Sequence, residues 1–334
     1  MNHINVGIVG ASGYTGLELL KLLINHKYFK ISYVATTEGG VKLSRLHPSL
    51  SEVFECDIEA FSASEAALKC ELLFLALPHQ VSMNYVKELS EYDVKIVDLS
   101  ADYRLELDTY EKHYCLHVDK PNLQKSVYGL PELFREEIAS SVLVANPGCY
   151  PTASILAIQP FLNYMKKDTQ IIIDAKSGVS GAGKKCSEKT HYVSINENHH
   201  AYAALTHRHA PEIAQYVNMS ESKISFVPHL LPTTRGMLCS IYMSVEKDID
   251  AIEILKEYYI NEPFVRIRQT PVDIKSVGGT NYCDIFATCK DGVLFVSSAI
   301  DNLLRGASSQ ALVNANLMMG IDESESVPFI AYVP

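Results

Sequence analysis

Cys149 is the residue whose type and surroundings best suit nucleophilic chemistry in this sequence. It follows a Pro-Gly pair and precedes Pro151, a residue type favoured in the first turn of a helix. If Pro151 takes the first helical position, Cys149 lies just ahead of the helix, where the helix dipole favours a thiolate. Such a cysteine could attack a carbonyl and hold the acyl group as a thioester. On local context alone, a buried and inert cysteine remains the favoured interpretation, because cysteine is among the most buried residue types.

A dense group of ionisable residues supplies a candidate base for this thiol. In Thr206-His-Arg-His-Ala-Pro-Glu212, His207 and His209 flank Arg208, just ahead of a proline that suits another helix start. An ordinary thiol is only a few per cent ionised near neutral pH, so a partner that titrates near neutrality is needed, and imidazole does so. Neither histidine fits an apolar period. This favours a functional site, with a polar surface turn as the alternative.

A glycine-rich segment near the amino terminus could cradle a dinucleotide. It lies between an apolar run at residues 4–9 and a series of leucines at helical spacing, which is the order of strand, turn and helix that a dinucleotide fingerprint requires. Gly10 would permit the sharp turn, Gly13 the approach of a pyrophosphate, and Gly16 close packing of helix on strand. The spacing is G-x-x-G-x-x-G, so a glycine turn that serves only packing is the alternative. The candidate cofactor-binding residues of this loop are Gly10, Ser12, Gly13, Tyr14, Thr15 and Gly16.

The end of the second expected strand indicates which dinucleotide would bind. An acidic residue there would hold the ribose hydroxyls of NAD and repel a 2′-phosphate. This chain instead has Thr36 and Thr37, followed by Lys42 and Arg45. Hydroxyls with nearby cations suit a 2′-phosphate, so the prediction is NADP(H), although Glu38 weakens the preference.

Two patterns of strands must position these residues. Up to residue 147, buried-type strands alternate with helical stretches, which predicts an α/β domain with a Rossmann-type, doubly wound parallel sheet. Beyond it, over residues 148–301, strands are separated by loops, which predicts an α+β domain with a mainly antiparallel sheet. The expected strands are 4–9, 31–35, 72–77 and 95–99 in the first domain, and 170–175, 223–227, 237–245, 283–289 and 293–299 in the second.

Bulk composition excludes several classes of protein. The 334 residues are 47% hydrophobic and 20% charged, with a formal charge of −10, and they contain no basic run. This argues against nucleic-acid partners and against an anionic membrane surface. The eight cysteines form no C-x-x-C pair and show no metal-ligand spacing, so a reducing cytoplasm fits best and no metal is expected. Neither a secretory signal nor a membrane span is evident.

Taken in order, eight segments resemble the N-acetyl-γ-glutamyl-phosphate reductase family, which is related to aspartate-semialdehyde dehydrogenase. They span nearly the whole chain, and as an ordered set they are far more specific than any one motif. The segments are Gly10-Ala-Ser-Gly-Tyr-Thr-Gly16, Asp98-Leu-Ser-Ala-Asp-Tyr-Arg104, Tyr128-Gly-Leu-Pro-Glu132, Asn146-Pro-Gly-Cys-Tyr-Pro-Thr152, Ser177-Gly-Val-Ser-Gly-Ala-Gly183, Thr206-His-Arg-His-Ala-Pro-Glu-Ile213, Pro228-His-Leu-Leu-Pro-Thr-Thr-Arg-Gly236 and Asp301-Asn-Leu-Leu-Arg-Gly306.

The resemblance implies an arginine-biosynthesis enzyme that reduces N-acetyl-γ-glutamyl phosphate with NADPH and releases phosphate. Cys149 would be the catalytic thiol and His209 the acid/base. The Ser177–Gly183 turn, with Ser177, Gly178 and Gly181, would lie with Asn302 near the nicotinamide. A C-terminal helix, assigned to residues 302–334, would complete the first domain. Where the family usually has lysine, this chain has Arg305.

The substrate implied by the resemblance carries a phosphate and a carboxylate, so guanidinium groups are expected to anchor it. The candidate substrate-binding residues are Arg104, Arg208, Glu212 and Arg235, and for Arg235 an ordinary surface arginine is an equal alternative. Self-association into a homodimer or homotetramer is expected as well.

Two other functions stay open. One is a related acyl-phosphate reductase that acts on aminoadipyl or aspartyl phosphate, because the preferred chain length depends on pocket dimensions. The forms Pro-Gly-Cys-Tyr-Pro-Thr and His-Arg-His-x-Pro-Glu argue against the aspartyl substrate. The other is a dinucleotide sensor without catalysis, and the presence of both Cys149 and His209 in intact motifs argues against it.

Overall fold

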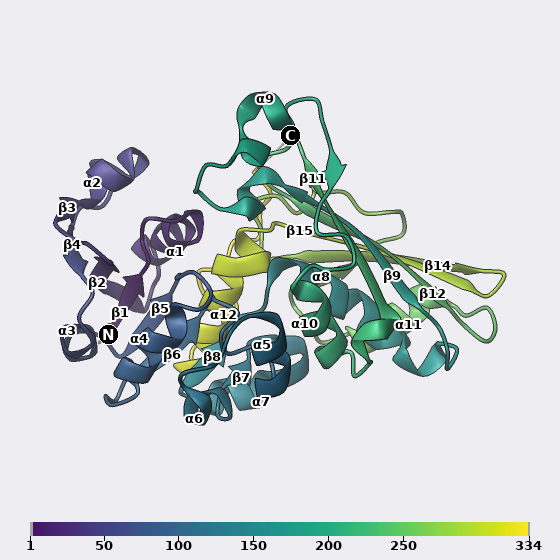
Figure 1. Cartoon of the computed structure of the whole chain (residues 1–334), viewed down its shortest axis with the longest axis horizontal. Coiled ribbons are helices and arrows are strands. Elements are labelled where there is room, and N and C mark those ends of the chain that lie inside the picture. The colour runs from purple at the N-terminus through teal and green to yellow at the C-terminus, as the bar shows by residue number, and fades with distance from the viewer. Residues whose placement is uncertain (1–2, 333–334) are drawn as a thin grey trace. The chain divides into compact units, whose positions relative to one another are not determined.

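The chain folds into two compact units in the computed structural model, which describes residues 3–332. The first unit comprises residues 3–147 and returns near the end of the chain for residues 307–327. The second comprises residues 148–306 together with residues 328–332. In Figure 1 the first unit runs from purple to blue with a yellow helix, and the second from teal to yellow-green.

The first unit is built on an eight-stranded sheet with the order β3-β4-β2-β1-β5-β6-β8-β7. Every neighbouring pair is parallel except β3 and β4, which are antiparallel. Its strands are β1 (Ile4–Val9), β2 (Phe29–Thr36), β3 (Val41–Lys42), β4 (Asp57–Ala60), β5 (Leu72–Leu75), β6 (Lys95–Asp98), β7 (Val127–Tyr128) and β8 (Leu143–Ala145). The helices are α1 (Tyr14–Ile24), α2 (Leu43–Leu46), α3 (Ala63–Lys69), α4 (Ser82–Leu89), α5 (Leu107–His113), α6 (Lys120–Leu123), α7 (Pro131–Ser140) and α12 (Ser309–Met318).

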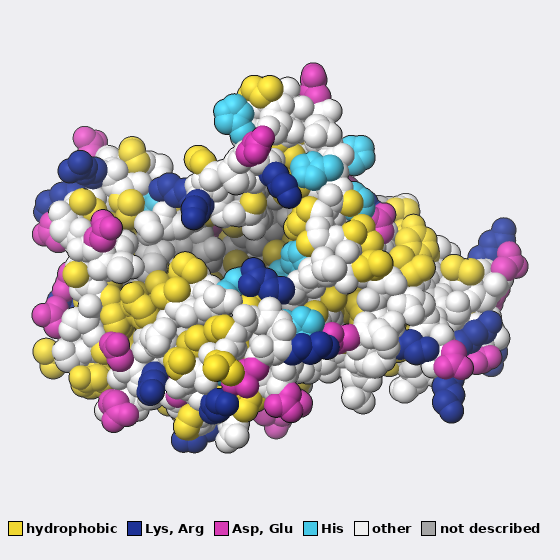
Figure 2. Space-filling model, in the orientation of Figure 1, with side chains coloured by type: hydrophobic (Ala, Val, Ile, Leu, Met, Phe, Trp, Pro, Cys, Tyr) yellow, Lys and Arg dark blue, Asp and Glu magenta, His cyan; other side chains and the backbone are white. Residues whose placement is uncertain are grey.

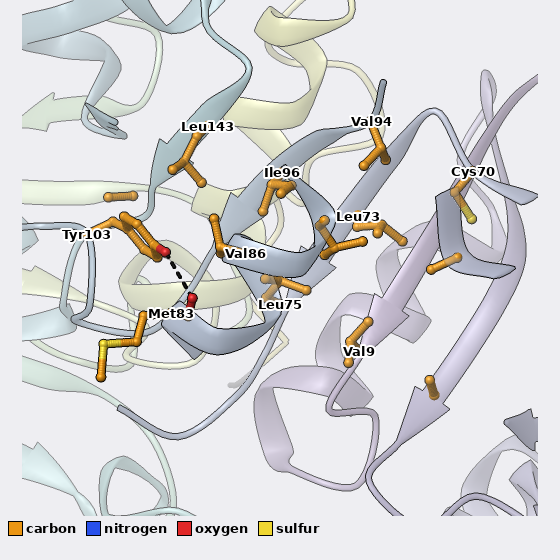
Figure 3. Packing of buried hydrophobic residues seen from close by; sticks show 14 of the residues in the cluster. Val9, Cys70, Leu73, Leu75, Met83, Val86, Val94, Ile96, Tyr103 and Leu143 are labelled. Carbon is orange, nitrogen blue, oxygen red and sulfur yellow. Dashed lines mark hydrogen bonds between the residues drawn. The ribbon is translucent and has the colours of Figure 1, made fainter. Parts of the chain in front are cut away.

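The continuous apolar run of β5 explains its central place in this sheet. All four of its residues are buried, as expected for a parallel strand covered on both faces. Figure 3 shows one of these faces, where Leu73 and Leu75 pack with Val86 of α4 and Ile96 of β6. Burying side chains of this size contributes about 1.5–3 kcal/mol each.

The second unit is built on a seven-stranded sheet with the order β10-β11-β9-β12-β15-β14-β13. Its pairs are antiparallel except β11 with β9 and β13 with β14. The strands are β9 (Ile171–Gly178), β10 (His200–Ala201), β11 (Ile224–Leu231), β12 (Met237–Ser244), β13 (Val265–Ile267), β14 (Cys283–Lys290) and β15 (Val293–Ile300). The helices are α8 (Cys149–Ile158), α9 (Tyr192–Ile195), α10 (His209–Tyr216) and α11 (Ala251–Tyr258).

Alternating burial along the strands shows that helices cover one face of this second sheet. In β12, buried residues alternate with more exposed ones along the strand, as in a sheet with one open face. Helix α8 packs on β12 and β15, α11 packs on β14, and α10 packs on α8 and β11. Every residue of α8 after Cys149 is buried, so this helix is the centre of the unit's core.

The predicted fold class is confirmed, although several boundaries differ. Each expected strand is present, and no end differs from the expectation by more than four residues. The short strands β3, β4, β7, β8, β10 and β13 were not predicted, because two to four residues carry too little periodicity. Of the C-terminal stretch 302–334 assigned to a helix, residues 304–318 are helical, because a π-helical turn at Leu304–Ser308 leads into α12, and residues 333–334 lie outside the described residues. Only residues 307–327 belong to the first unit, α12 occupies Ser309–Met318, and residues 302–306 and 328–332 belong to the second unit.

Charged side chains of both signs are intermingled over the face seen in Figure 2. Among the described helices, none combines the length and the apolar character needed to cross a membrane.

We predict that Gly10→Ala lowers the melting temperature by about 5 °C or more, because two costs add at this position. Gly10 has a φ of +91°, and an added Cβ would lie 2.3 Å from the carbonyl oxygen of Ala76. The matched control is Gly40→Ala in the same unit, where φ is +74° but nothing lies within 4 Å of the added Cβ. This variant should lose only about 2 °C. Differential scanning calorimetry would compare them, and equal losses would contradict the steric argument.

Candidate active site

Cys149 is the first residue of α8, with Gly148 as the N-cap. The helix therefore begins two residues earlier than predicted, and Pro151 is its third residue, still within the first turn where proline is tolerated. Thr152 closes this turn by donating its backbone N–H and its hydroxyl to the Gly148 carbonyl, each at 2.9 Å. Cys149 is partly exposed at the positive end of the helix dipole, which favours a thiolate.

Other cysteines have surroundings of the opposite kind. Burial raises the pKa of the thiols of Cys70 and Cys239 to about 12, and that of Cys56 to about 11. Such groups stay protonated and unreactive near neutral pH. The position of Cys149 at a partly exposed helix start therefore distinguishes it from these three.

An aromatic cluster brings His207 and His209, which lie just before and at the start of α10, close to the start of α8. The ring of Tyr150 meets those of His207 and His209 edge to face, each with its centroid 5.8 Å away. The Tyr150 hydroxyl lies 3.1 Å from that of Tyr202. His209 is the first residue of α10, just as Cys149 is the first residue of α8, and the two helices pack together. The structure thus places the His-Arg-His segment beside Tyr150, the residue that follows Cys149.

His207 and His209 differ in what they can do. Burial, and secondarily the charge of Arg208, lowers the pKa of His207 to about 4. His207 is therefore neutral at physiological pH, and its Nδ1 accepts the backbone N–H of His209 at 3.2 Å. This bond helps to fix the backbone at the start of α10. The remaining histidine, His209, is the better candidate for proton transfer.

Glu212 contacts the backbone beside the thiol. It is 1% exposed, and its Oε1 accepts the N–H of Gly148 at 2.9 Å. This contact favours a role in positioning the start of α8 over the predicted contact with the substrate. Gly306 confines the thiol from another side, because an added Cβ there would lie 2.6 Å from the Cβ of Cys149.

The three candidate arginines have different environments. Arg104, in the first unit, is 4% exposed, and it donates to the carbonyls of Asn146 at 2.7 Å and Leu99 at 2.8 Å. These bonds favour a structural brace over the predicted direct anchor. Arg235 lies 3.5 Å from the buried carboxylate of Asp301. Arg208 is exposed at the N-cap of α10, next to both histidines.

The glycine loop has the geometry that a dinucleotide needs. Gly10 turns beneath the carbonyl of Ala76, and an added Cβ at Gly16 would lie 2.7 Å from the Gly10 oxygen. The packing of the protein itself therefore requires glycine at positions 10 and 16. At Gly13, the N-cap of α1, an added Cβ would meet nothing nearer than 4.0 Å. This glycine leaves room for a ligand to approach the backbone. The loop follows β1 at the point where the strand order reverses, which is where open α/β sheets bind ligands.

The other cofactor candidates in the first unit lie on this loop and at the end of β2. Tyr14 and Thr15 begin α1, and the Thr15 carbonyl accepts the hydroxyl of Ser308 at 3.0 Å. Thr36 accepts the N–H of Gly39 at 3.0 Å, while Thr37 is exposed. Lys42 pairs with Asp57 at 2.7 Å, which leaves the exposed Arg45 as the better placed cation of the two.

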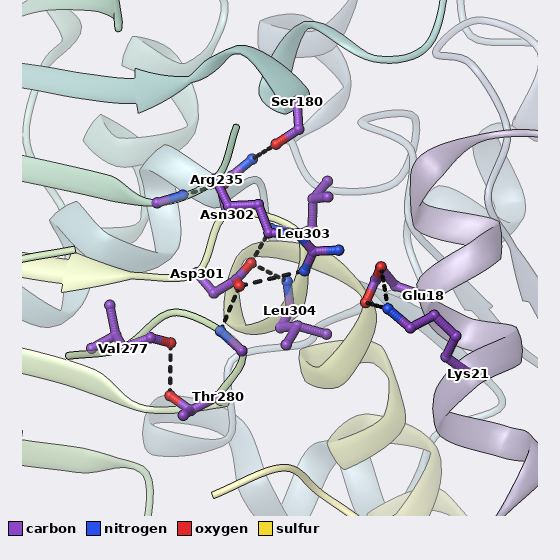
Figure 4. Close-up of polar contacts among 12 residues, drawn as sticks. Glu18, Lys21, Ser180, Arg235, Val277, Thr280, Asp301, Asn302, Leu303 and Leu304 are labelled. Carbon is purple, nitrogen blue, oxygen red and sulfur yellow. Dashed lines mark hydrogen bonds and ion pairs between the residues drawn. The ribbon is translucent and has the colours of Figure 1, made fainter. Parts of the chain in front are cut away.

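In the second unit, Asn302 joins the segments expected near the nicotinamide (Figure 4). Its Oδ1 accepts the N–H of Gly236 at 2.8 Å, and its Nδ2 donates to the hydroxyl of Ser180 at 3.0 Å. An added Cβ at Gly178 would lie 2.9 Å from the backbone of residues 233–235, and one at Gly181 would lie 2.8 Å from Ser177 Oγ. The structure therefore brings Ser177, Gly178, Gly181 and Asn302 together, and both ends of the Asn302 amide bind protein groups.

Several residues of this region were missed by sequence reasoning. Asp301 is completely buried, and its carboxylate accepts the N–H groups of Leu303, Leu304 and Gly279. Tyr150 and Gly306 stand inside quoted motifs, so the motifs contain a signal for them. The sequence contains no such signal for Tyr202, since nothing in it pairs Tyr202 with Tyr150.

Comparisons with known proteins agree over the whole chain. The family described as "Semialdehyde dehydrogenase, NAD binding domain" matches residues 5–141, and "Semialdehyde dehydrogenase, dimerisation domain" matches residues 149–302. The first match supports a nicotinamide dinucleotide as cofactor. The chain is 59% identical to N-acetyl-gamma-glutamyl-phosphate reductase of Sulfurimonas denitrificans, with 100% of both chains covered. It is 45% identical to the protein of the same name from Methanocaldococcus jannaschii, over 96% of this chain and 97% of that one.

Solved structures match at the level of the fold. Aspartate semialdehyde dehydrogenase II of Vibrio cholerae aligns with a TM-score of 0.73 at 16% identity, over 96% of this chain and 99% of that one. The Candida albicans aspartate semialdehyde dehydrogenase with NADP aligns with a TM-score of 0.66 at 12% identity, over 95% and 99%. With relatives of one name aligned end to end, the chain belongs to the N-acetyl-γ-glutamyl-phosphate reductase family.

Proposed function

We propose that this protein catalyses the NADPH-dependent reduction of N-acetyl-γ-glutamyl phosphate to N-acetylglutamate 5-semialdehyde, with release of phosphate, as a step of arginine biosynthesis. The observation that carries the proposal is the pairing of two helix starts in the second unit. Cys149 begins α8, His209 begins α10, and Tyr150 packs against the histidine. The relatives aligned over the full chain carry the name of this reaction.

In the first half of the reaction, the sulfur of Cys149 attacks the acyl carbonyl carbon. His209 accepts the thiol proton, and the helix dipole stabilises the thiolate. The bond from the carbonyl carbon to the phosphate oxygen breaks, and inorganic phosphate leaves with the bonding electrons. A thioester with Cys149 remains.

In the second half, NADPH, when bound, would supply one hydride to the thioester carbon and be oxidised to NADP⁺. Protonated His209 donates its proton to the oxygen of the resulting hemithioacetal and recovers it when that oxygen re-forms a carbonyl. The carbon–sulfur bond then breaks, the aldehyde leaves, and Cys149 returns as a thiolate. Glu212 and Gly306 act on the thiol indirectly. Glu212 binds the backbone N–H of Gly148, and Gly306 packs closely against Cys149.

NADP is the proposed form of the cofactor. The hydroxyls of Thr36 and Thr37 with the exposed Arg45 suit a 2′-phosphate, and the last residue of β2 is Thr36, while the carboxylate of the exposed Glu38 follows two residues later. The pyrophosphate would lie against Ser12, Gly13 and the start of α1. Ser177, Gly178, Gly181 and Asn302 would shape the nicotinamide end.

For the substrate's anions, Arg208 and Arg235 are the proposed anchors. Arg208 adjoins His209, and Arg235 is part of the turn that packs on Gly178. Their planar guanidinium groups suit a phosphate or a carboxylate. Arg104 is proposed to act through the backbone carbonyl of Asn146, three residues before the nucleophile.

Self-association through the open face of the second sheet is also proposed. Ile172, Tyr242 and Phe295 form a row across β9, β12 and β15 on the face opposite the helices. Ile172 is 46% exposed and Tyr242 is 41% exposed, which a second copy would cover. A homodimer, or a tetramer built from it, fits this surface.

A cytoplasmic location is proposed, because a reducing compartment keeps Cys149 as a thiol.

The reaction is tested in the reverse direction. Purified protein with N-acetylglutamate 5-semialdehyde, phosphate and NADP⁺ should produce NADPH, measured by absorbance. The aminoadipate and aspartate semialdehydes are the comparison substrates. Turnover only with one of these would replace the proposed substrate, and no turnover with any of them would favour the sensor.

We predict that Cys149→Ala reduces turnover by about 10⁴-fold or more, since no thioester can form. NADPH binding, measured by fluorescence titration, should be unchanged because the pyrophosphate loop is intact. Cys289→Ala is the control, because Cys289 is also partly exposed but lies on β14 away from both helix starts. Activity that persists in Cys149→Ala would exclude the thioester.

We predict that His209→Asn lowers kcat by about 10²–10⁴-fold and abolishes the pH dependence attributed to the imidazole. His207→Asn is the matched control. His207 is neutral above a pKa of about 4, so its replacement should leave the shape of the pH–rate profile near neutrality unchanged. Steady-state rates across pH would compare the two. Loss of the profile in His207→Asn instead would assign the proton transfer to the other histidine.

A further inference from the structure

We propose that His47 is a positioning residue for the dinucleotide, because it holds the peptide between Ala11 and Ser12 in the orientation that the pyrophosphate needs. This inference rests on the proposed function, since it concerns the same cofactor loop. His47 lies outside the glycine motif. It directly follows α2, in the segment of chain between β2 and β4.

The contact itself is short and buried. His47 is 5% exposed, and its Nε2 lies 2.6 Å from the carbonyl oxygen of Ala11. A carbonyl oxygen can only accept a hydrogen bond, so Nε2 carries the proton and donates it. A buried carbonyl without this donor would lose a hydrogen bond that water cannot replace at that site.

The backbone of His47 is held by residues outside the glycine loop. Its backbone N–H donates to the carbonyl of Leu43 at 2.8 Å, and its carbonyl accepts the N–H of Leu50 at 3.0 Å. Both leucines are buried, with Leu43 at 0% and Leu50 at 4% exposure. The segment after β2 therefore fixes the donor, and the donor in turn restrains the loop.

The restrained peptide belongs to the part of the loop that meets the anion. Ala11 is completely buried, and its N–H donates to the carbonyl of Ala35 at 3.3 Å. The hydrogen bond from His47 fixes the carbonyl oxygen of Ala11. In a planar trans peptide the C=O and the following N–H point in opposite directions. When His47 holds the Ala11 oxygen on its own side, the N–H of Ser12 points to the opposite side.

This orientation matters because a rotated peptide would present the wrong charge. If the Ala11 carbonyl lost its donor, it would turn toward water, and its partial negative charge would approach the phosphate oxygens. The N–H of Ser12 would turn away from them. His47 thus links the segment that reads the 2′-position to the loop that holds the pyrophosphate.

The test compares His47→Leu with His47→Gln by titrating each protein with NADPH. Leucine removes the donor, whereas the glutamine amide can place an N–H near the position of Nε2. We expect His47→Leu to weaken NADPH binding about tenfold and His47→Gln to stay within about threefold of the wild type. His26→Leu is the matched control, because His26 is also buried in this unit but bonds through Nε2 to Asn316 at 3.1 Å. It should bind NADPH normally.

A second ligand separates orientation of the loop from a collapse of the segment after β2. Adenosine 2′-monophosphate carries the 2′-phosphate but no pyrophosphate, so its affinity should be equal in the wild type and His47→Leu. Equal weakening of both ligands would overturn the inference, as would unchanged NADPH binding in His47→Leu. If His47→Leu does not fold by circular dichroism, His47→Phe replaces it, since Phe keeps a ring without a donor. If the wild-type protein binds neither NADPH nor NADH, this inference and the proposed cofactor are overturned together. If the wild type binds NADPH and His47→Leu binds it equally well, this inference alone is overturned.

Discussion

The start of α8 is the constraint on which the proposed chemistry of this protein depends. A helix that begins inside a domain leaves N–H groups that need partners. Here Gly148 donates its N–H to Glu212 and accepts two hydrogen bonds from Thr152. Because these contacts hold the residue before Cys149, the thiol has a fixed position at the positive end of the dipole. The apolar remainder of α8 then fixes the helix within the core.

Buried polar groups organise the rest of the second unit in the same way. Asp301 accepts three backbone N–H groups and lies near Arg235, so its charge is compensated although it has no exposure to solvent. The next residue, Asn302, connects the turns at Ser180 and Gly236. A single short segment therefore holds three loops, and it leads directly to Gly306, which packs against Cys149.

The candidate residues divide into those that can meet a ligand and those that support them. Cys149, His209 and Arg208 are at least partly exposed at helix starts, whereas Glu212 and Arg104 are buried and bind backbone groups. A charged residue inside a functional motif thus need not touch the substrate. His47 extends this division to the first unit, where a buried side chain from outside the motif supports the cofactor loop.

The sequence alone determined the fold class and the place of the glycine loop, because hydrophobic periodicity and turn motifs depend on near neighbours in the chain. Cys149 and His209 became the reactive candidates through the ordered family motifs, since local context by itself favoured an inert cysteine and did not choose between the two histidines. It also placed the long strands to within a few residues. Only the tertiary structure decided that Glu212 binds Gly148, that Asp301 joins three segments, and that His47 reaches Ala11. These contacts join residues far apart in sequence, and their geometry depends on how whole helices and strands pack. Short strands such as β10 were also decided at this level, since two residues form a strand only when a neighbouring strand pairs with them.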